Sequence, residues 1–184
     1  MTIGIAFIRG INVGGKHKVS MEKLRELCED AGLTDAKTYI ASGNLVFRCS
    51  EKAMTRAGLK IEAIIEKECG FRPGVVVRSI DEMKNVVAAN PFAKEKTLDL
   101  SRFLVMFLSE ELPAEAKKRL KELAAAPERI EPLKKEVYLY YANGILEAKV
   151  PFTAVEKAVK VSGTCRNWNT IVKVVAMAEE LEAG

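Results

Sequence analysis

A hairpin signal near residue 43 constrains the fold more than any other feature of this sequence. The runs Thr38–Ala41 and Leu45–Cys49 have the composition of β-strands, and Ser42-Gly43-Asn44 between them is typical of a turn. Neighbouring antiparallel strands interrupt the repeated strand–helix crossovers that build a parallel α/β sheet. We therefore expect a mostly antiparallel sheet in the first half of the chain.

Helix signals lie on both sides of this hairpin. An apolar strand, Ile3–Ile8, comes first, and Ser20 is predicted to cap a helix that stops at Gly32. A second apolar helical face ends before Gly70 and leads into the strand Val75–Val77. The predicted order is βαββαβ, which is the order of a ferredoxin-like α+β sandwich.

The second half of the chain approximately repeats this order. Asn143-Gly144 is a strong hairpin signal, and a strand near Glu128–Leu133 is left open, so the predicted order is βαββα or βαβββα. The other predicted elements are the strand Phe103–Leu108, a helix that begins at Pro113, the strands Val137–Tyr141 and Ile145–Val150, and a helix near Thr153–Val159.

These patterns predict an α+β protein with two ferredoxin-like (α/β plait) halves in tandem and an extra C-terminal helix. The predicted division is residues 1–78 for the first half, 79–100 for a connecting helix and linker, and 101–184 for the second half with the C-terminal helix. Ser79 and Glu82 have the spacing of a capping box at the start of the connecting helix. Trp168 falls on the apolar face of the C-terminal helix, where it is expected to anchor the core.

The segment between the first strand and the first helix contains a partial phosphate-binding pattern. Gly10, Gly15 and Lys16 have the P-loop spacing, but His17 stands where Ser or Thr would hold magnesium. The next helix is predicted to begin after Ser20, too late for such a lysine. The P-loop match is therefore interpreted as a coincidence. Two interpretations stay open: a loop whose backbone N–H groups and lysines bind an anion, or a glycine turn without a ligand.

Positive charge is concentrated in two segments of the chain. Residues 9–25 and residues 148–173 each carry a net charge of +4, although the whole chain carries only +4. If the two segments meet in space, they form a positively charged surface that attracts an anion. The alternative is that these lysines are simply solvated.

The candidate ligand-binding residues are cations, amides and glycines of these two segments and of the first hairpin. The asparagines could instead form turns or cap the final helix, and the arginine of the second segment could bridge to an acidic residue rather than bind phosphate or carboxylate. The predicted anion patch consists of Arg9, Asn12, Gly14, Gly15, Lys16, Lys18, Asn44, Arg166, Asn167, Asn169 and Lys173.

Alternation along the second predicted hairpin places Tyr138 and Tyr140 on the side opposite the core. Tyrosines on the open face of such a sheet would resemble the base-stacking surface of RNA-recognition modules. However, the strands Ile3–Ile8 and Phe103–Leu108 are apolar on both faces, which indicates sheets that are covered on both sides. Base stacking on the sheet is therefore disfavoured.

The sequence offers little support for catalysis, and no metal or cofactor is expected. His17 is the only histidine and the four cysteines form no C-x-x-C pair, so neither a catalytic triad nor a zinc site is predicted. Reduced thiols and a cytoplasmic location are expected. No apolar run approaches the roughly 18 residues of a membrane span, and the N-terminus lacks a signal-peptide pattern.

Two longer motifs carry a family resemblance. RGINVGGKHKVSMEKLRELCEDAGLTDAKTYIASGNLVF (residues 9–47) and TCRNWNT (residues 164–170) resemble the bacterial proteins grouped as domain of unknown function 1697. The resemblance implies a pair of ferredoxin-like halves and no established reaction. Ala148-Lys149 departs from the family pattern, in which Ser-Lys is expected, so a serine with a chemical role at that place is missing here.

Three hypotheses about function follow. The first is a cytosolic binding module whose basic patch holds a nucleic-acid backbone or another polyanion. The second is a small enzyme that holds a phosphorylated small molecule at the glycine-rich loop. The third is an interaction protein whose apolar surfaces form a homodimer. The first is ranked slightly above the second, and no membrane partner is expected.

Overall fold

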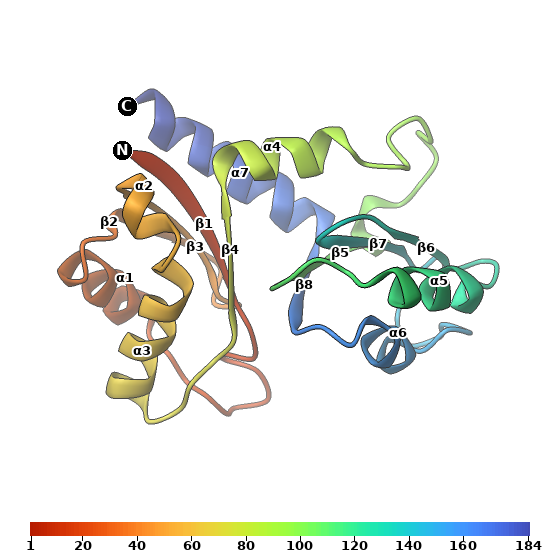
Figure 1. Cartoon of the computed structure of the whole chain (residues 1–184), viewed down its shortest axis with the longest axis horizontal. Coiled ribbons are helices and arrows are strands. Elements are labelled where there is room, and N and C mark those ends of the chain that lie inside the picture. The colour runs from red at the N-terminus through yellow and green to blue at the C-terminus, as the bar shows by residue number, and fades with distance from the viewer. The chain divides into compact units, whose positions relative to one another are not determined.

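The computed structural model describes all 184 residues, and it contains two four-stranded antiparallel sheets (Figure 1). The chain divides into two compact units, which are residues 1–85 with 172–184 and residues 86–171. The boundaries fall within two helices, α4 (Ile80–Ala88) and α7 (Trp168–Ala183). The α+β class with tandem halves and a C-terminal helix is confirmed.

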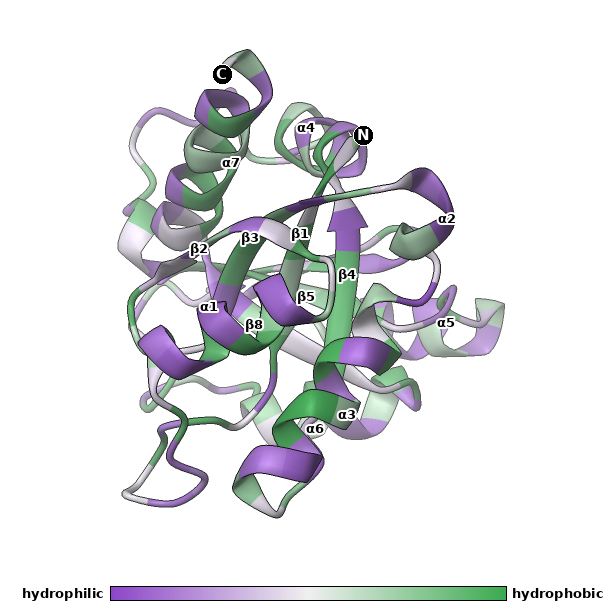
Figure 2. Ribbon diagram, turned by 90° about the vertical axis from the view of Figure 1, so that its left-hand side faces the viewer, coloured by the Kyte–Doolittle hydropathy of each residue, from purple (hydrophilic) through white to green (hydrophobic).

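The first unit has the predicted order of elements. Its sheet order is β2-β3-β1-β4, and every neighbouring pair is antiparallel. The helices α1 and α3 cover one face of the sheet (Figures 1 and 2). Their apolar side chains join those of the strands in a single core. Its elements are β1 (Thr2–Ile8), α1 (Met21–Asp30), β2 (Thr34–Tyr39), β3 (Asn44–Cys49), α2 (Glu51–Met54), α3 (Ala57–Cys69) and β4 (Val75–Ser79), followed by the start of α4.

Local signals account for the helix boundaries in this unit. The Ser20 hydroxyl accepts a hydrogen bond from Lys23 N at 3.3 Å and caps α1 as predicted. The capping box at α4 is also confirmed, since Ser79 N donates to Glu82 Oε2 at 2.8 Å and Glu82 N donates to Ser79 Oγ at 3.2 Å. The end of α7 is joined to this unit by Arg48 Nη2, which donates to Leu181 O at 2.6 Å.

The predicted β2–β3 hairpin is present and approaches the end of β1 closely. Ile8 N donates to Gly43 O at 2.8 Å, and Gly43 has a left-handed φ of 83°. A Cβ atom at Gly43 would lie 2.7 Å from Ile8 O, a distance that real side chains do not tolerate. Glycine is therefore required at this turn both by conformation and by space.

The second unit repeats the topology of the first. Its sheet order is β6-β7-β5-β8, again antiparallel throughout, with α5 and α6 packed on one face. The register is equivalent as well, because Ile5 pairs with Val46 and Arg78, and Val105 pairs with Tyr138 and Arg166. Its elements are a 3-10 turn at Leu100–Arg102, β5 (Phe103–Leu108), α5 (Ala114–Leu123), β6 (Arg129–Pro132), β7 (Glu136–Tyr140), α6 (Phe152–Val159) and β8 (Gly163–Asn167), followed by the start of α7.

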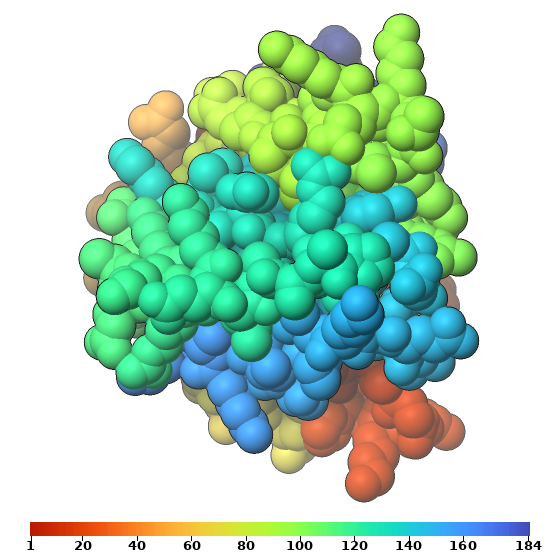
Figure 3. Space-filling view, turned by 90° about the vertical axis from the view of Figure 1, so that its right-hand side faces the viewer, coloured from red at the N-terminus to blue at the C-terminus, as the bar shows by residue number.

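The predicted hairpin around Asn143-Gly144 is wrong. Gly144 does form a turn, since its N–H donates to Tyr141 O at 2.9 Å, but residues 145–150 form no strand. β7 is already flanked by β6 and β5, so neither edge of β7 is open to a further strand. The segment lies at the surface of the second unit, where Leu146 is 97% exposed (light blue in Figure 3). The strand left open near residue 130 is real, and the polar strand β8 was not predicted.

Tyr138 and Tyr140 lie on the face opposite the helix-side core, as the alternation predicts, and this face is covered rather than open. Tyr138 is fully buried and Tyr140 is nearly so. The Tyr138 hydroxyl donates to Val86 O at 2.9 Å, and its ring stacks on Phe103 at a centroid distance of 6.1 Å. Trp168 stacks on the same Phe103 at 4.6 Å, which confirms it as a core anchor. The sheet is therefore covered on both faces, as the apolar strands indicated.

The segment predicted as a linker packs within the second unit. Phe92 is buried against Phe103, and the Arg129 guanidinium lies 4.2 Å from the centre of the Phe92 ring. Arg129 also forms a bidentate ion pair with Glu95, with both N···O distances at 2.6 Å. Residues 172–184 were assigned to the second half by sequence but cluster with the first unit. No helix has both the length and the apolar character to cross a bilayer.

Candidate anion-binding loop

The connection between β1 and α1, residues 9–20, is an ordered loop held at its neck by Asn12 (orange-red at the lower end of β1 in Figure 1). Asn12 Oδ1 accepts from Val19 N at 2.9 Å, and Nδ2 donates to Val19 O at 3.0 Å. The same Nδ2 donates to Ala41 O at 2.9 Å, in the turn between β2 and β3. Asn12 thus joins the two ends of the loop and attaches them to the sheet, so it positions the loop rather than offering a vacant amide.

The tip of the loop is a two-residue turn. Lys16 N donates to Val13 O at 3.1 Å, and Asn12 N donates to His17 O at 3.1 Å. Gly14 and Gly15 between them have φ values of 59° and 74°, the left-handed conformation that closes two-residue hairpins. A Cβ at either glycine would meet nothing within 4 Å, so conformation and not space favours glycine here. The prediction that these glycines turn the chain is confirmed.

His17 is fixed against the neighbouring α3–β4 connection. Its ring stacks on Phe71 with a centroid distance of 4.3 Å and an interplanar angle of 22°. Its Nδ1 lies 3.2 Å from Gly10 O, and because a carbonyl only accepts, Nδ1 carries the proton. The backbone of His17 is left-handed, with φ of 51°. The imidazole is therefore held in a defined place although the residue is exposed.

The cations of this region fall into two groups. Lys23 pairs with Glu26 at 3.3 Å, and Arg25 donates to the Thr38 hydroxyl at 2.8 Å, so both are engaged along α1. Lys16 and Lys18 are exposed and form no ion pair with a carboxylate. Arg9 is also exposed at the start of the loop, where its backbone N–H donates to Gly74 O at 2.8 Å. Lys16 and Lys18 therefore display positive charge that no carboxylate pairs with.

Asn44 has a structural role beside the loop. It is buried, and its Nδ2 donates to Tyr39 O at 3.0 Å and to Ser42 Oγ at 3.1 Å. These bonds close the β2–β3 turn, the same turn to which Asn12 is attached. The two predicted asparagines therefore lie near each other, and both use their side-chain amides to shape the backbone.

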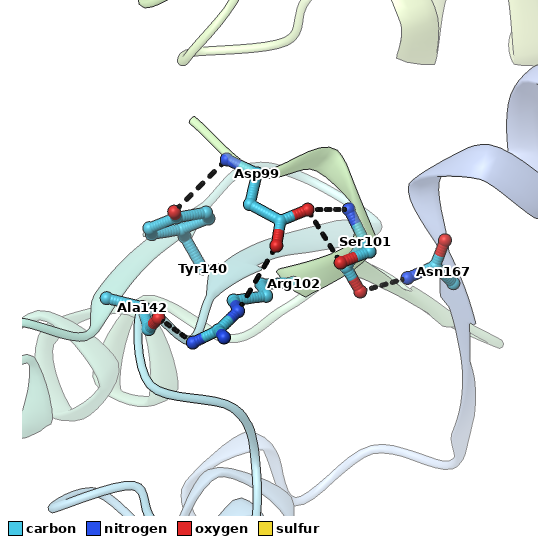
Figure 4. Close-up of polar contacts among 6 residues, drawn as sticks. All are labelled: Asp99, Ser101, Arg102, Tyr140, Ala142 and Asn167. Carbon is cyan, nitrogen blue, oxygen red and sulfur yellow. Dashed lines mark hydrogen bonds and ion pairs between the residues drawn. The ribbon is translucent and has the colours of Figure 1, made fainter. Parts of the chain in front are cut away.

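Asn167 and Asn169 lie at the start of α7 in the second unit. Asn167 Oδ1 accepts from Asn169 N at 2.9 Å and caps the helix, as predicted. Asn167 Nδ2 donates to Ser101 O at 2.6 Å, which connects it to a network around Asp99 (Figure 4). Asp99 accepts from Ser101 Oγ at 2.6 Å and lies 3.3 Å from Arg102 Nε. This network stabilises the start of β5, and Asn167 takes part in it through its hydrogen bond to Ser101 O.

Arg166 lies on β8 with much of its guanidinium withdrawn from water. Its Nη1 donates to Thr164 Oγ1 at 2.7 Å and to Cys165 O at 2.8 Å. Burial lowers the pKa of Arg166 to about 10. Arg78, at the equivalent register position of β4 in the first unit, is buried too and donates to Val77 O at 3.0 Å. Both arginines thus bond the carbonyl of the preceding residue, so Arg166 is built into its strand rather than held out to solvent.

The thiols offer no nucleophile at neutral pH. Burial raises the pKa of Cys165 to about 12, and the opposing effect of Arg166 is smaller. Burial likewise raises the pKa of Cys28 to about 12. No group of three or more His, Cys, Asp or Glu side chains is arranged to hold a metal ion.

Two buried polar side chains of the second unit have no hydrogen-bond partner, and sequence reasoning missed the burial of the first, Glu128. Glu128 is 3% exposed, and neither of its carboxylate oxygens has a hydrogen-bond partner within the protein. The buried Tyr141 hydroxyl has none either. Burial raises the pKa of Tyr141 to about 12, with smaller contributions from Cys165 and Glu128. A glutamate next to Pro127 has the local signature of a solvated turn, so no sequence signal pointed to its burial.

The predicted patch residues therefore separate into two sets. The first unit contains the loop, Asn44 and Lys173, which lies exposed on α7. The second unit contains Arg166, Asn167 and Asn169. The meeting of the two basic segments in one surface stays a prediction.

Two ferredoxin-like halves in tandem, the first of them carrying a glycine-rich basic loop, define the class of protein. The chain belongs to the family described as protein of unknown function (DUF1697), whose model matches residues 1–138. It is similar to a solved structure, the conserved bacterial protein SP0830 from Streptococcus pneumoniae, at 25% identity and a TM-score of 0.73. That similarity covers 96% of this chain and 98% of the other. No curated protein matches the chain.

Proposed function

We propose that this protein is a cytosolic binding module whose loop at residues 9–20 holds a phosphate-rich polyanion. Lys16 and Lys18 contact the phosphates, and Arg9 adds positive charge at the start of the loop. The observation that carries this proposal is the loop tip itself, which presents two lysines without carboxylate partners. Exposed unneutralised cations attract polyanions and release their bound counterions on contact.

The loop is suited to this role because its shape is fixed before a ligand arrives. Asn12 closes its neck with three hydrogen bonds, and the stacked His17 holds the chain segment that follows the tip. A preorganised loop loses less conformational entropy on binding than a mobile one. The backbone N–H groups of Gly14 and Gly15 form no hydrogen bond within the protein, so they are donors available to an anion beside Lys16.

Binding of inorganic polyphosphate at increasing salt concentration tests the proposal. The double variant Lys16→Ala/Lys18→Ala is expected to bind about tenfold more weakly at low salt, and the slope of log K against log salt is expected to fall by about 1 to 1.5. The matched control is Lys121→Ala/Lys134→Ala, which removes the same charge from exposed positions of the second unit. Equal losses of affinity in both double variants would show that only the net charge of the protein matters, and would refute a binding site at the loop.

A phosphorylated small molecule is the second candidate, and the two glycine N–H groups beside Lys16 favour it. Thermal-shift measurements with inorganic phosphate, nucleotides and sugar phosphates separate the two. A rise in Tm with one of these ligands, abolished in Lys16→Ala, supports the small molecule. No shift with any of them, together with salt-dependent polyphosphate binding, supports the polyanion.

A further inference from the structure

We propose that the polyanion is a single-stranded nucleic acid and that one of its bases stacks on the imidazole of His17. This inference deepens the proposed function and rests on it. It concerns the loop alone, and it names the chemical group that distinguishes a nucleic-acid strand from a bare polyanion.

The first reason is that His17 presents a fixed, flat ring at the surface. One face of the imidazole is stacked on Phe71, with the centroids 4.3 Å apart, and no second aromatic ring contacts His17. Its Nδ1 is held at 3.2 Å from Gly10 O, so the ring does not rotate away from Phe71 without losing both contacts. Since His17 is exposed, the opposite face of the ring is available to a planar ligand.

The second reason is that His17 has a lysine on each side of it in the chain. Lys16 and Lys18 directly precede and follow His17 in the sequence, and neither pairs with a carboxylate. Arg72 follows Phe71, but it is paired with two carboxylates, Glu62 at 3.1 Å and Glu66 at 2.8 Å, so it adds no positive charge for a ligand. A flat ring with an unpaired lysine on each side of it in the chain suits a strand in which bases alternate with phosphates.

The third reason is that other polyanions leave the ring unused. A duplex hides the faces of its bases within the stack, and polyphosphate has no planar group. The sheet offers no competing platform, because Tyr138 and Tyr140 are buried. The loop offers an aromatic surface for a base in the stacked pair of His17 and Phe71, and Lys16 and Lys18 adjoin His17 in the chain.

The test compares two probes of equal length and charge. One is an oligothymidine of about 12 nucleotides and the other is an abasic strand of the same length, each labelled for fluorescence anisotropy. The native protein is expected to bind the oligothymidine about tenfold more tightly than the abasic strand. His17→Asn removes the ring but tolerates the left-handed backbone, and it is expected to lose this preference while binding the abasic strand unchanged. His17→Tyr keeps an aromatic face and is expected to retain the preference.

The outcomes separate the two proposals. If neither strand binds at low salt, the proposed function itself fails. If both strands bind equally well and binding depends on Lys16 and Lys18, the polyanion site stands and base stacking is refuted. A preference for oligothymidine that survives in His17→Asn also refutes stacking on this ring. An unchanged Tm in each variant shows that the fold is intact.

Discussion

In each half of this protein the central strand leads to the first helix, but the two connections differ in length and in charge. Both leave the first strand in the same way, since Arg9 N donates to Gly74 O and Ser109 N donates to Ser162 O, each at 2.8 Å. The first half then uses residues 9–20 to reach α1, whereas the second uses only residues 109–113 to reach α5. The long connection carries Arg9, Lys16 and Lys18, and the short one carries Glu110 and Glu111.

The difference in length between these two connections shows which part of the longer one the sheet topology requires. The second half proves that a short acidic segment is enough to lead from the central strand to the first helix with the same sheet order. The glycine turn and the lysines of the first half are therefore additional to the topology. Residues 13–18 of this loop are exposed and are not needed for the topology, whereas Ile11 and Val19 belong to the core, so the exposed tip is a good place for a binding site.

The largest effect is expected from exchanging the connections. Replacing residues 9–20 with the segment Ser-Glu-Glu-Leu-Pro of residues 109–113 should leave a folded but less stable protein, because the core side chains Ile11 and Val19 and the Asn12 hydrogen bonds are lost. It should reduce polyphosphate binding at low salt by about 100-fold or more, because three cations are replaced by two anions. Circular dichroism and anisotropy measure the two properties. The control replaces Glu110 and Glu111 with Ala, which should leave the affinity within about twofold. A chain that fails to fold after the exchange would break the comparison, since the long loop would then be needed for the fold.

A smaller effect is expected at the neck of the loop. Asn12→Ala removes three hydrogen bonds, two of them part-buried, and is expected to lower the free energy of unfolding by about 2–3 kcal/mol. Urea denaturation measures this. Asn143→Ala, at an exposed asparagine of the second half, should change it by less than about 0.5 kcal/mol. Similar small changes in both variants would show that the neck does not hold the loop.

The halves also differ in and just after the strand beside the central one, where the second half has buried tyrosines at positions 138 and 141. Tyr138 occupies the register position of Val46, and Tyr138→Phe should cost about 1–2 kcal/mol because the buried Val86 O loses its donor. Tyr141→Phe should be neutral or slightly stabilising, because the Tyr141 hydroxyl has no partner. Denaturation of the two variants side by side measures the difference. Equal costs would contradict the assignment of hydrogen bonds.

Tyr141 is also expected to make the free energy of unfolding depend on pH. Burial raises the pKa of Tyr141 to about 12, so the unfolded chain loses this proton first as the pH rises above its ordinary pKa of 10.0. The folded state then binds more protons than the unfolded state, and stability falls between about pH 10 and pH 12. Tyr141→Phe should lose less stability than the native protein over this interval. Parallel curves of unfolding free energy against pH would rule this out.

The smallest effect is expected at the helix that follows the last strand of each half. Ser79 begins α4 with a capping box, and Ser79→Ala should cost about 1 kcal/mol or less. Asn167→Ala should cost more, because Asn167 caps α7 and also donates to Ser101 O. Thermal unfolding ranks the two. A larger loss at Ser79 would contradict the different roles of these caps.

The sequence predicted the first half well because its signals are local. Ser20, the turn at Gly43 and the pair Ser79 and Glu82 each act on backbone groups within a few residues. The second half was predicted less well, because Asn143-Gly144 specifies a turn but not a partner for the strand after it. Pairing depends on which edges of β7 are already occupied, and that is a property of the whole sheet.

The candidate site was predicted in part for the same reason. Residue types identified the loop, its glycine turn and its lysines. They did not show that Asn12 closes the neck or that His17 stacks on Phe71, because these contacts join residues far apart in the chain. For Arg166 the residue types left two roles open, an anion ligand or a bridge to an acidic residue, and they did not show that much of its guanidinium is withdrawn from water. The burial of a charged side chain follows from tertiary packing and leaves little trace in sequence.

The close fit of Gly43 against Ile8 has a consequence for the evolution of affinity. Asn12 donates a hydrogen bond to Ala41 O, which lies in the β2–β3 turn. Gly43 of the same turn packs against Ile8 at the end of β1. A side chain at Gly43 would push that turn outward, and the displacement would pass through Asn12 to the lysines without altering any residue that meets a ligand. Under the proposed function, substitutions in the β2–β3 turn are therefore expected to change polyanion binding although the charge of the loop stays the same.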